Sequence, residues 1–374
     1  MKALLYSPSL LRFLAARLLG KRFPKRLLPL SLKEVPLPER PGFVRVKVRL
    51  SGVCGSDLAL LYGKSSPSLS PFFSFPAVLG HEILGEIDGV RVAVNPLLAC
   101  VDRGLPLCER CAAGEEGLCQ NVAEGGLAPG MLGYHRDLPG GWGEWVLARP
   151  ERLYLIPAGV PDERAVLSEP VAVVLRGLKK LIPFPGEVVI VGLGTLGLLA
   201  VRLLRVLGFS GKIFVVAKYS YQVERAKAFG ADEVFRSAQE ALRARAKRYR
   251  SLIFEGFRGG YEAVIESSGS GKGFREALNL TQEGGRVLLL GAPGVELVDL
   301  SPFWFKEVEL EGSYTYTPRE FQEAVGMLLH LAGLESLVGG IFPLEAYRDA
   351  LSSRSKALFC PTLASLSQRL SPAC

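Results

Sequence analysis

The pattern of hydrophobic and polar positions changes near residue 170. Before it, short β-rich runs at 44–48, 78–94 and 142–155 are broken by glycine and proline, which predicts an irregular antiparallel β-barrel. After it, apolar runs alternate with stretches of helical period, which predicts a parallel, doubly wound sheet and an α/β fold. Strands are expected at 188–191, 213–216, 263–266 and 286–290, and helices at 196–207, 222–229 and 273–280.

The last part of the chain is assigned back to the first domain, through a helix at 318–331 and a strand at 357–360. The expected domains are therefore 1–168 completed by 312–374, and 169–311. Leucines at 10–19 recur at helical spacing, interrupted by Arg12 and Arg17, and predict an extra amphipathic helix in an insertion at 10–26. We expect this helix to pack on the body or on a partner, and favour this over membrane contact.

Composition excludes some classes of protein. The chain has 374 residues, of which 48% are hydrophobic and 22% charged, so it can form two cores and is not a disordered chain. Its net charge is +8, with basic clusters at 21–26 and 243–250. We interpret both clusters as solvated helix faces, because the second spreads around a helix and lacks interleaved aromatic residues. No nucleic-acid partner is expected, and no membrane partner either, since no apolar run reaches membrane-spanning length.

The seven cysteines are grouped one, four and two along the chain. In a chain of this size such grouping favours metal ligation over disulfides, and hence a reducing cytoplasm. The sequence is also poor in Asn and Gln, which is typical of thermophilic sources.

The group of four predicts a closed, structural zinc site. Cys108, Cys111 and Cys119 lie in a short segment whose glycines allow it to turn. The linker between Cys100 and Cys108 is long enough for Cys100 to fold back onto the other three. The fourth ligand stays open, because Asp102 is an alternative to Cys100.

A second set of donors predicts a catalytic zinc site with an open position. Cys54 and His81 stand in glycine-flanked turns, and Glu82 and Glu169 offer carboxylates. Two carboxylates and a thiolate together would make a net negative complex and a poor electrophile, so one carboxylate is expected to act through water; which one stays open.

Two residues beside Cys54 are expected to assist this site. Ser56 is placed to carry away the hydroxyl proton of an alcohol, and Asp57 to orient His81.

A glycine-rich turn predicts a dinucleotide site. Gly192 permits a tight turn, Gly194 lets the backbone approach a pyrophosphate, and Gly197 allows close packing of helix on strand. Thr195 and Leu196 open the following helix, and we expect Ser267 and Gly291 near the nicotinamide.

The residues expected to contact the 2′ position of the cofactor's ribose favour NADP over NAD. About twenty residues past the turn, where an acidic residue would accept a bond from the ribose 2′-hydroxyl, the chain has Ala217 and Lys218. No carboxylate there repels a 2′-phosphate, although Lys218 as a solvated loop residue is the alternative.

With these motifs in order along nearly its whole length, the chain resembles the zinc-containing medium-chain dehydrogenases, in particular their polyol, glucose and threonine dehydrogenase-like branch. The resemblance implies a GroES-like barrel as catalytic domain, a Rossmann domain, an active site in the cleft between them, and homodimers or homotetramers. In that family the residues that match Cys54, His81 and Glu82 or Glu169 look like catalytic zinc ligands, and the residue matching Ser56 like a proton-relay hydroxyl. The motifs that carry the resemblance are Gly-Val-Cys-Gly-Ser-Asp at 52–57, Gly-His-Glu at 80–82, the four cysteines at 100–119 (the cysteine lobe), Gly-Trp-Gly-Glu-Trp at 141–145, Ser-Glu-Pro at 168–170 and the glycines of 192–197.

The sequence thus predicts a cytoplasmic alcohol or polyol dehydrogenase that uses NAD(P), one catalytic zinc and one structural zinc. A zinc-assisted carbonyl reductase is the alternative within the class. A catalytically silent NADPH-binding structural or sensing protein is the alternative outside it. The substrate is expected to be a small alcohol or carbonyl compound that the sequence does not name.

Overall fold

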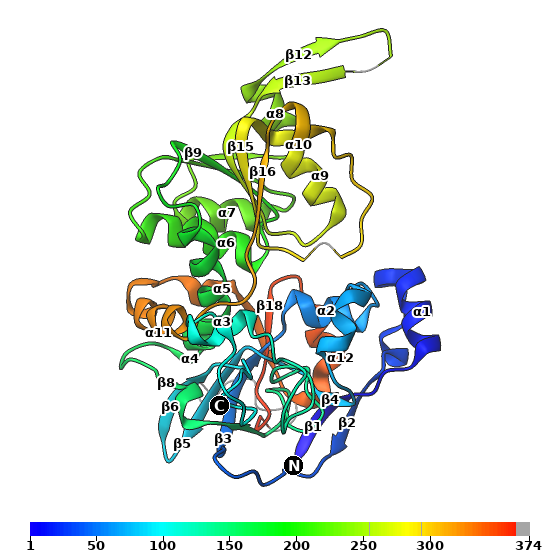
Figure 1. Cartoon of the computed structure of the whole chain (residues 1–374), viewed down its shortest axis with the longest axis vertical. Coiled ribbons are helices and arrows are strands. Elements are labelled where there is room, and N and C mark those ends of the chain that lie inside the picture. The colour runs from blue at the N-terminus through cyan, green and yellow to red at the C-terminus, as the bar shows by residue number, and fades with distance from the viewer. Residues whose placement is uncertain (254, 293, 364–374) are drawn as a thin grey trace. The chain divides into compact units, whose positions relative to one another are not determined.

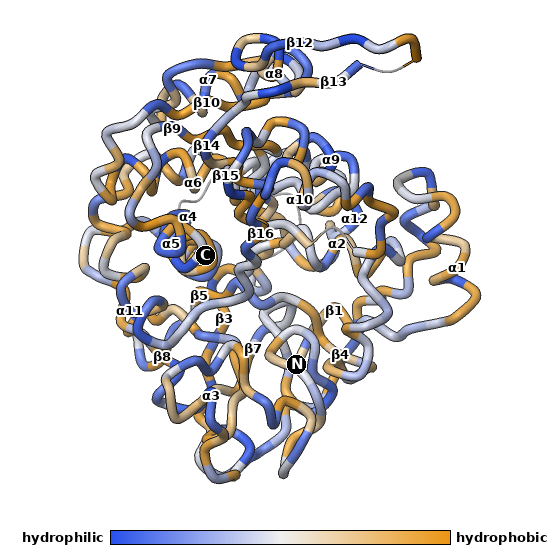
Figure 2. The backbone as a smooth tube through the Cα atoms, turned by 45° about the horizontal axis from the view of Figure 1, so that its top comes forward, coloured by the Kyte–Doolittle hydropathy of each residue, from blue (hydrophilic) through white to orange (hydrophobic). Residues whose placement is uncertain are grey.

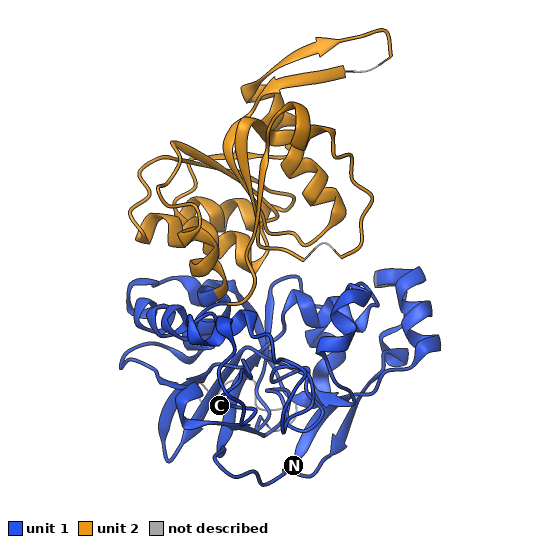
Figure 3. Cartoon of the chain, in the orientation of Figure 1, with its two compact units in different colours: residues 1–172, 316–374 blue, residues 173–315 orange. Residues whose placement is uncertain are grey.

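The computed structural model describes residues 1–253, 255–292 and 294–363. The chain divides into two compact units, one formed by residues 1–172 with the chain from 316 onward and the other by 173–315 (Figure 3). In the described part of the chain, no helix combines the length and the apolar character needed to cross a membrane.

The first unit is built on a seven-stranded sheet of order β17-β18-β3-β5-β6-β8, with β7 also paired to β3 (Figure 1). Strand β3 is central because alternate side chains such as Val46, Val48 and Leu50 are buried, while Lys47 between them is exposed. A smaller sheet has the order β2-β1-β4. The strands are β1 (Lys2–Tyr6), β2 (Leu30–Glu34), β3 (Val44–Gly52), β4 (Ala77–Val78), β5 (Ile83–Ile87), β6 (Val90–Val94), β7 (Trp145–Ala148), β8 (Leu153–Leu155), β17 (Val338–Phe342) and β18 (Lys356–Phe359).

Pairing of β18 with β3 brings a late segment of the chain beside the residues that precede Cys54. Leu358 pairs with Gly52 and Phe359 with Ser51, both antiparallel. Strand β18 thus belongs to the sheet of the first unit, and residues 364–374 of the segment assigned to the first domain lie outside the described residues. The helices of this unit are α1 (Leu10–Leu19), α2 (Gly55–Leu61), α3 (Glu109–Ala112), α4 (Asp162–Ala165), α5 (Ser168–Lys179, which continues into the second unit), α11 (Pro318–Met327) and α12 (Tyr347–Ala350).

The predicted helix at 10–19 is α1, which buries little of itself. Ala16 is its buried residue, and Arg17 donates a hydrogen bond to the Gly63 carbonyl at 3.1 Å. Its leucines Leu11 and Leu18 are 81% and 86% exposed. Figure 2 colours much of α1 as hydrophobic, and the exposed fractions show that its leucines face solvent while Ala16 packs on the body.

The second unit holds a six-stranded, all-parallel sheet of order β11-β10-β9-β14-β15-β16. When only the strands of this sheet are counted along the chain, the order is 3-2-1-4-5-6. In this doubly wound order ligands bind where the strand order reverses, between β9 and β14. The elements are β9 (Glu187–Val191), α6 (Thr195–Val206), β10 (Lys212–Val216), α7 (Ser220–Phe229), β11 (Glu233–Phe235), α8 (Ala238–Arg245), β14 (Tyr261–Glu266), α9 (Gly271–Leu280), β15 (Thr281–Leu289), α10 (Ser301–Phe305) and β16 (Glu309–Gly312).

The basic residues at 243–250 are exposed, as expected, but the interpretation that they spread around a helix was wrong after Arg245. Helix α8 ends at Arg245, and the chain then forms an antiparallel hairpin of β12 (Ala246–Arg250) and β13 (Glu255–Gly259). Arginine and lysine tolerate either structure, so tertiary pairing with 255–259 decided the outcome.

One cysteine departs from the expectation that these residues serve metals. Cys360, the residue after β18, is disulfide-bonded. Among the described residues, five cysteines are free: Cys54, Cys100, Cys108, Cys111 and Cys119.

Candidate metal centres and dinucleotide site

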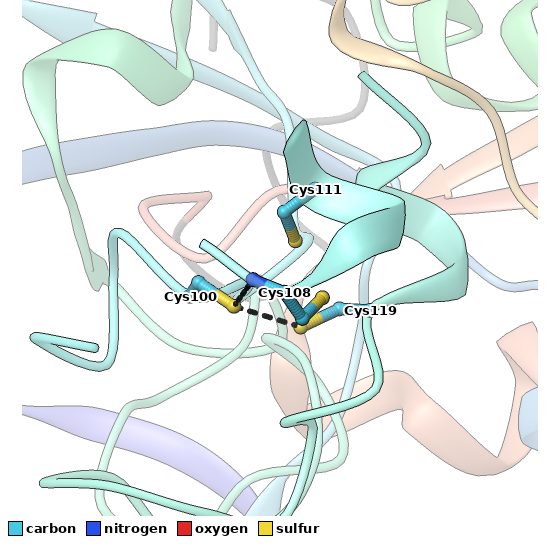
Figure 4. Close-up of side chains that lie close together, drawn as sticks. All are labelled: Cys100, Cys108, Cys111 and Cys119. Carbon is cyan, nitrogen blue, oxygen red and sulfur yellow. Dashed lines mark hydrogen bonds between the residues drawn. The ribbon is translucent and has the colours of Figure 1, made fainter. Parts of the chain in front are cut away.

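The four cysteines at 100–119 converge in one lobe (Figure 4). Their sulfur atoms all lie within 4.8 Å of one another, and those of Cys100 and Cys119 are 3.6 Å apart. A tetrahedral zinc ion with Zn–S bonds of about 2.3 Å needs sulfurs roughly 3.8 Å apart. The donor set and its spacing therefore fit a closed zinc site.

Local hydrogen bonds favour the thiolate form of Cys108, whereas burial raises the pKa of Cys111 and Cys119. The pKa of Cys108 falls to about 6, although burial opposes this, because the backbone N–H groups of Cys111 and Gln120 donate to its sulfur. Zinc binds thiolate rather than thiol. Cys108 can therefore be present as the thiolate that zinc binds.

Of the two alternatives for the fourth donor, the structure brings Cys100 to the cluster. Asp102 lies elsewhere: it accepts a hydrogen bond from the Ala99 N–H at 2.8 Å and pairs with the buried guanidinium of Arg152, whose Nε is 3.1 Å away. Its carboxylate is therefore already satisfied.

A second group of donors gathers around the start of α2. Cys54 is the N-cap of this helix, directly after β3, and His81 and Glu82 follow β4. One donor atom from each lies within 4.8 Å of the others. Gly80 is required before them, because its φ is +92° and a Cβ there would lie 2.3 Å from the Trp142 ring.

The buried side chain of Asp57 contacts both Cys54 and His81. It is fully buried; one oxygen accepts from the Cys54 N–H at 2.9 Å, and the other is 3.4 Å from His81 Nδ1. Since Nδ1 faces Asp57 and has no closer partner, Nε2 is the His81 nitrogen that remains to bind a metal. The predicted orienting role of Asp57 is consistent with this geometry.

The two candidate carboxylates have different surroundings. Both oxygens of Glu82 accept hydrogen bonds from Lys356 Nζ, at 2.6 and 2.8 Å, in a pair that is almost completely buried. Glu169, on the first turn of α5, lies outside the compact donor group of Cys54, His81 and Glu82. Burial raises the pKa of Glu169 to about 7, with His81 lowering it and Glu82 raising it. Glu82 is thus paired with a buried ammonium group, and Glu169 is a carboxyl that can carry a proton near neutrality.

Replacing Lys356 by Met should destabilise the zinc-free protein strongly, because the buried Glu82 carboxylate then has neither its ammonium partner nor a metal ion to balance its charge. We expect a loss of about 3–5 kcal/mol in the free energy of unfolding, measured by urea denaturation. The matched control is Lys2→Met, which breaks an equally short but exposed pair with Glu345 and should cost less than about 1 kcal/mol. Equal losses in the two variants would contradict the argument, and Glu82→Gln added to Lys356→Met should recover part of the loss.

The glycine turn after β9 has the geometry that a dinucleotide requires. Gly192 has φ +94° and a Cβ there would lie 2.5 Å from the Ser268 nitrogen, whereas a Cβ on Gly197 would lie 2.1 Å from the Gly192 carbonyl oxygen. Gly194, the N-cap of α6, has no atom within 4 Å of where a Cβ would stand. Space is therefore open at the helix N-terminus, where a pyrophosphate fits.

The remaining predicted cofactor residues surround the same edge of the sheet. Thr195 and Leu196 begin α6, and Ser267 follows β14 and donates to the Gly192 carbonyl at 2.6 Å. Gly291 closely follows β15, and the Gly269 nitrogen lies 2.3 Å from where its Cβ would be.

At the end of β10, Ala217 is buried and Lys218 is exposed. The Lys218 ammonium lies 5.4 Å from the centre of the Tyr219 ring, and the Arg225 guanidinium lies 5.4 Å from that of Tyr221. Of these two cations, Lys218 stands shortly after β10 at the position predicted to contact the ribose, whereas Arg225 lies within α7.

Sequence reasoning missed three residues of the metal group. Lys356 is the counter-ion of Glu82, Tyr134 lies within hydrogen-bond distance of Ser56 and Asp57, and Tyr316 lies beside Glu169. None stands in a recognisable spacing with Cys54, so no local signal pointed to them.

Comparison with known proteins matches two family models. Residues 40–158 match the alcohol dehydrogenase GroES-like domain, and residues 195–330 match the zinc-binding dehydrogenase model. The chain is 30% identical over 311 residues to L-galactonate-5-dehydrogenase of Escherichia coli, covering 79% of this chain and 82% of that protein. It is 28% identical over 331 residues to L-threonine 3-dehydrogenase of Anaeromyxobacter, covering 84% and 90%. A solved zinc-binding dehydrogenase structure from Sinorhizobium meliloti, bound to NADP, is similar with a TM-score of 0.71 and 26% identity, covering 89% of this chain and 96% of that one.

Proposed function

The chain belongs to the zinc-containing medium-chain dehydrogenase family, and from that premise we propose how its own residues serve the reaction. It is a zinc-dependent oxidoreductase that interconverts an alcohol or polyol and its carbonyl compound with NAD(P). When bound, zinc lowers the pKa of a coordinated alcohol and the nicotinamide accepts a hydride. The observation that carries the proposal is the convergence of a thiol, an imidazole and a carboxylate within 4.8 Å.

Cys54, His81 and Glu82 are proposed as the direct ligands of the catalytic zinc. The thiolate and the carboxylate balance the charge of a divalent ion, and the Lys356 ammonium bound to Glu82 restores a net positive charge. This keeps the site electrophilic. Glu169, whose pKa of about 7 allows it to hold a proton near neutrality, is proposed to act beside the ligands through water.

Ser56 is proposed to accept a hydrogen bond from the hydroxyl of the bound alcohol and, as the hydride leaves, to pass the released proton to water at its exposed side. It is exposed on the first turn of α2, two residues after Cys54, while Asp57 faces inward. Helical geometry thus separates the residue that meets substrate from the residue that orients His81.

The cysteine lobe is proposed to hold the second zinc, so that the full protein contains two zinc ions per chain. The four sulfurs close the coordination shell and leave no position for substrate. A structural role follows from this closure.

NADP is proposed as the preferred cofactor, and Lys218→Glu should reverse the preference. The new carboxylate would repel a 2′-phosphate and accept a bond from a free 2′-hydroxyl, so NADPH affinity should fall about 10- to 100-fold while NADH affinity is kept or improved. Titration of nucleotide fluorescence measures both constants. Lys212→Glu is the control, because it changes the same charge at the opposite end of β10. Wild-type protein that favours NAD would overturn the proposal.

The protein is further proposed to work in the cytoplasm of a thermophilic organism as a homodimer or homotetramer. The supporting observation on assembly is that β16 is an edge strand of the second unit's sheet, with Leu310 44% exposed. Light scattering of the purified protein measures the number of copies.

Hydride transfer against a panel of alcohols, polyols and sugars, combined with metal analysis, tests the function. We expect NADPH or NADH formation with at least one secondary alcohol or polyol, and two zinc ions per chain. A protein that binds NADPH and zinc but turns over no alcohol or carbonyl compound in the panel would instead be a silent cofactor-binding protein.

A further inference from the structure

Tyr134 joins two functional residues that are neighbours on α2. Its hydroxyl oxygen is 3.0 Å from Ser56 Oγ and 2.9 Å from Asp57 Oδ1. The side chain is buried, and its ring packs at 4.9 Å from the Phe73 centroid and 5.3 Å from that of His81. The hydroxyl is therefore held in place by its ring rather than free to move.

A count of hydrogens fixes the direction of these two bonds. A tyrosine hydroxyl has one hydrogen to donate, and an aspartate carboxylate only accepts. The hydrogen of Tyr134 must therefore go to Asp57, because a bond to a carboxylate is also the stronger of the two. At 3.0 Å the remaining contact is a bond in which Ser56 donates its hydrogen to Tyr134.

This direction leaves the Ser56 oxygen with its lone pairs available. Among the described residues, Tyr134 is the one side chain within hydrogen-bond distance of the Ser56 hydroxyl. Helix α2 carries no titratable side chain apart from Asp57. Without Tyr134, the Ser56 hydroxyl would be free to rotate and to point its hydrogen toward a substrate that also has a hydrogen to donate.

We propose that Tyr134 is a positioning residue that holds the Ser56 hydroxyl as an acceptor for the hydroxyl hydrogen of the substrate. The role is exerted through Ser56, and the chain of hydrogen bonds ends at Asp57, the residue that also faces His81. The inference rests on the proposed function, because it assigns a role in the oxidation of an alcohol. A Ser56 hydroxyl held in this way also favours substrates that can donate a hydroxyl hydrogen to its oxygen.

Tyr134→Phe tests the proposal, because it removes one oxygen and keeps the ring that packs on His81 and Phe73. With the best alcohol of the panel, kcat should fall roughly 10- to 100-fold and KM should change less. Zinc content and NADPH affinity should stay at the wild-type values. Calorimetry with a tertiary alcohol, which has a hydroxyl but no hydride to give, should show binding weakened roughly 3- to 10-fold.

A double-mutant cycle separates positioning from a structural effect. If Tyr134 acts through Ser56, the variant with both Ser56→Ala and Tyr134→Phe should be no slower than Ser56→Ala alone. The control Tyr6→Phe removes a hydroxyl from another buried tyrosine that packs on Phe75, and should keep the wild-type kcat.

Two results overturn the inference while the proposed function stands: wild-type kcat in Tyr134→Phe, or losses that multiply in the double variant. A wild-type protein that oxidises no alcohol overturns both.

Discussion

Cys54→Ser should lower the rate of hydride transfer by at least about a thousandfold. The substitution removes the soft ligand proposed for the catalytic zinc, and a loss of roughly 4 kcal/mol of transition-state stabilisation corresponds to this factor. NADPH affinity should stay within about threefold of wild type, because the glycine turn and Lys218 belong to the other unit of the chain. Steady-state kinetics and fluorescence titration measure the two effects.

Metal analysis provides the control for this variant. Zinc content should fall from two ions per chain to one, since the cysteine lobe is untouched. Full activity in the variant, or in wild-type protein from which all zinc has been removed, would contradict the assignment of Cys54 and of the reaction mechanism itself.

Cys111→Ser should destabilise the first unit by at least about 3 kcal/mol, because a structural zinc ion contributes its binding free energy to folding. Cys111 is the buried member of the turn that carries three of the sulfurs. We expect a lower midpoint of thermal unfolding, loss of one zinc ion and faster proteolysis within 100–119. The catalytic zinc should remain bound.

Asp102→Asn distinguishes the two candidates for the fourth ligand. It should leave the zinc content unchanged and weaken only the buried pair with Arg152. Loss of zinc in Asp102→Asn, with zinc retained in Cys100→Ser, would reverse the assignment of these residues.

The sequence predicted most regular elements because their hydrophobic period is local. The helix expected at 10–19 is α1, and the strand expected at 213–216 is part of β10. The hairpin of β12 and β13 was missed because Lys, Arg and Tyr at 247–250 carry no period, and only pairing with 255–259 makes them a strand.

The candidate sites show the same limit. Cysteines eight or fewer residues apart and glycines at fixed offsets are local signals, so the sequence alone located the lobe and the turn after β9. Lys356 and Tyr134 reach the metal group through sheet pairing and loop packing, and their chemistry is visible only when the chain is folded. The choice between Cys100 and Asp102 also required the fold, because it depends on where Arg152 stands.

The ion pair between Glu82 and Lys356 implies an order in which the two candidate metal sites are completed during translation. The two residues are separated by 274 positions, whereas Cys100 and Cys119 are separated by 19. If the four cysteines bind zinc as proposed, they are all available soon after residue 119 is synthesised, whereas Glu82 gains its ammonium partner only after β18 has been synthesised and has docked on β3. A nascent chain therefore gains its scaffold early and its reactivity only near the end of translation.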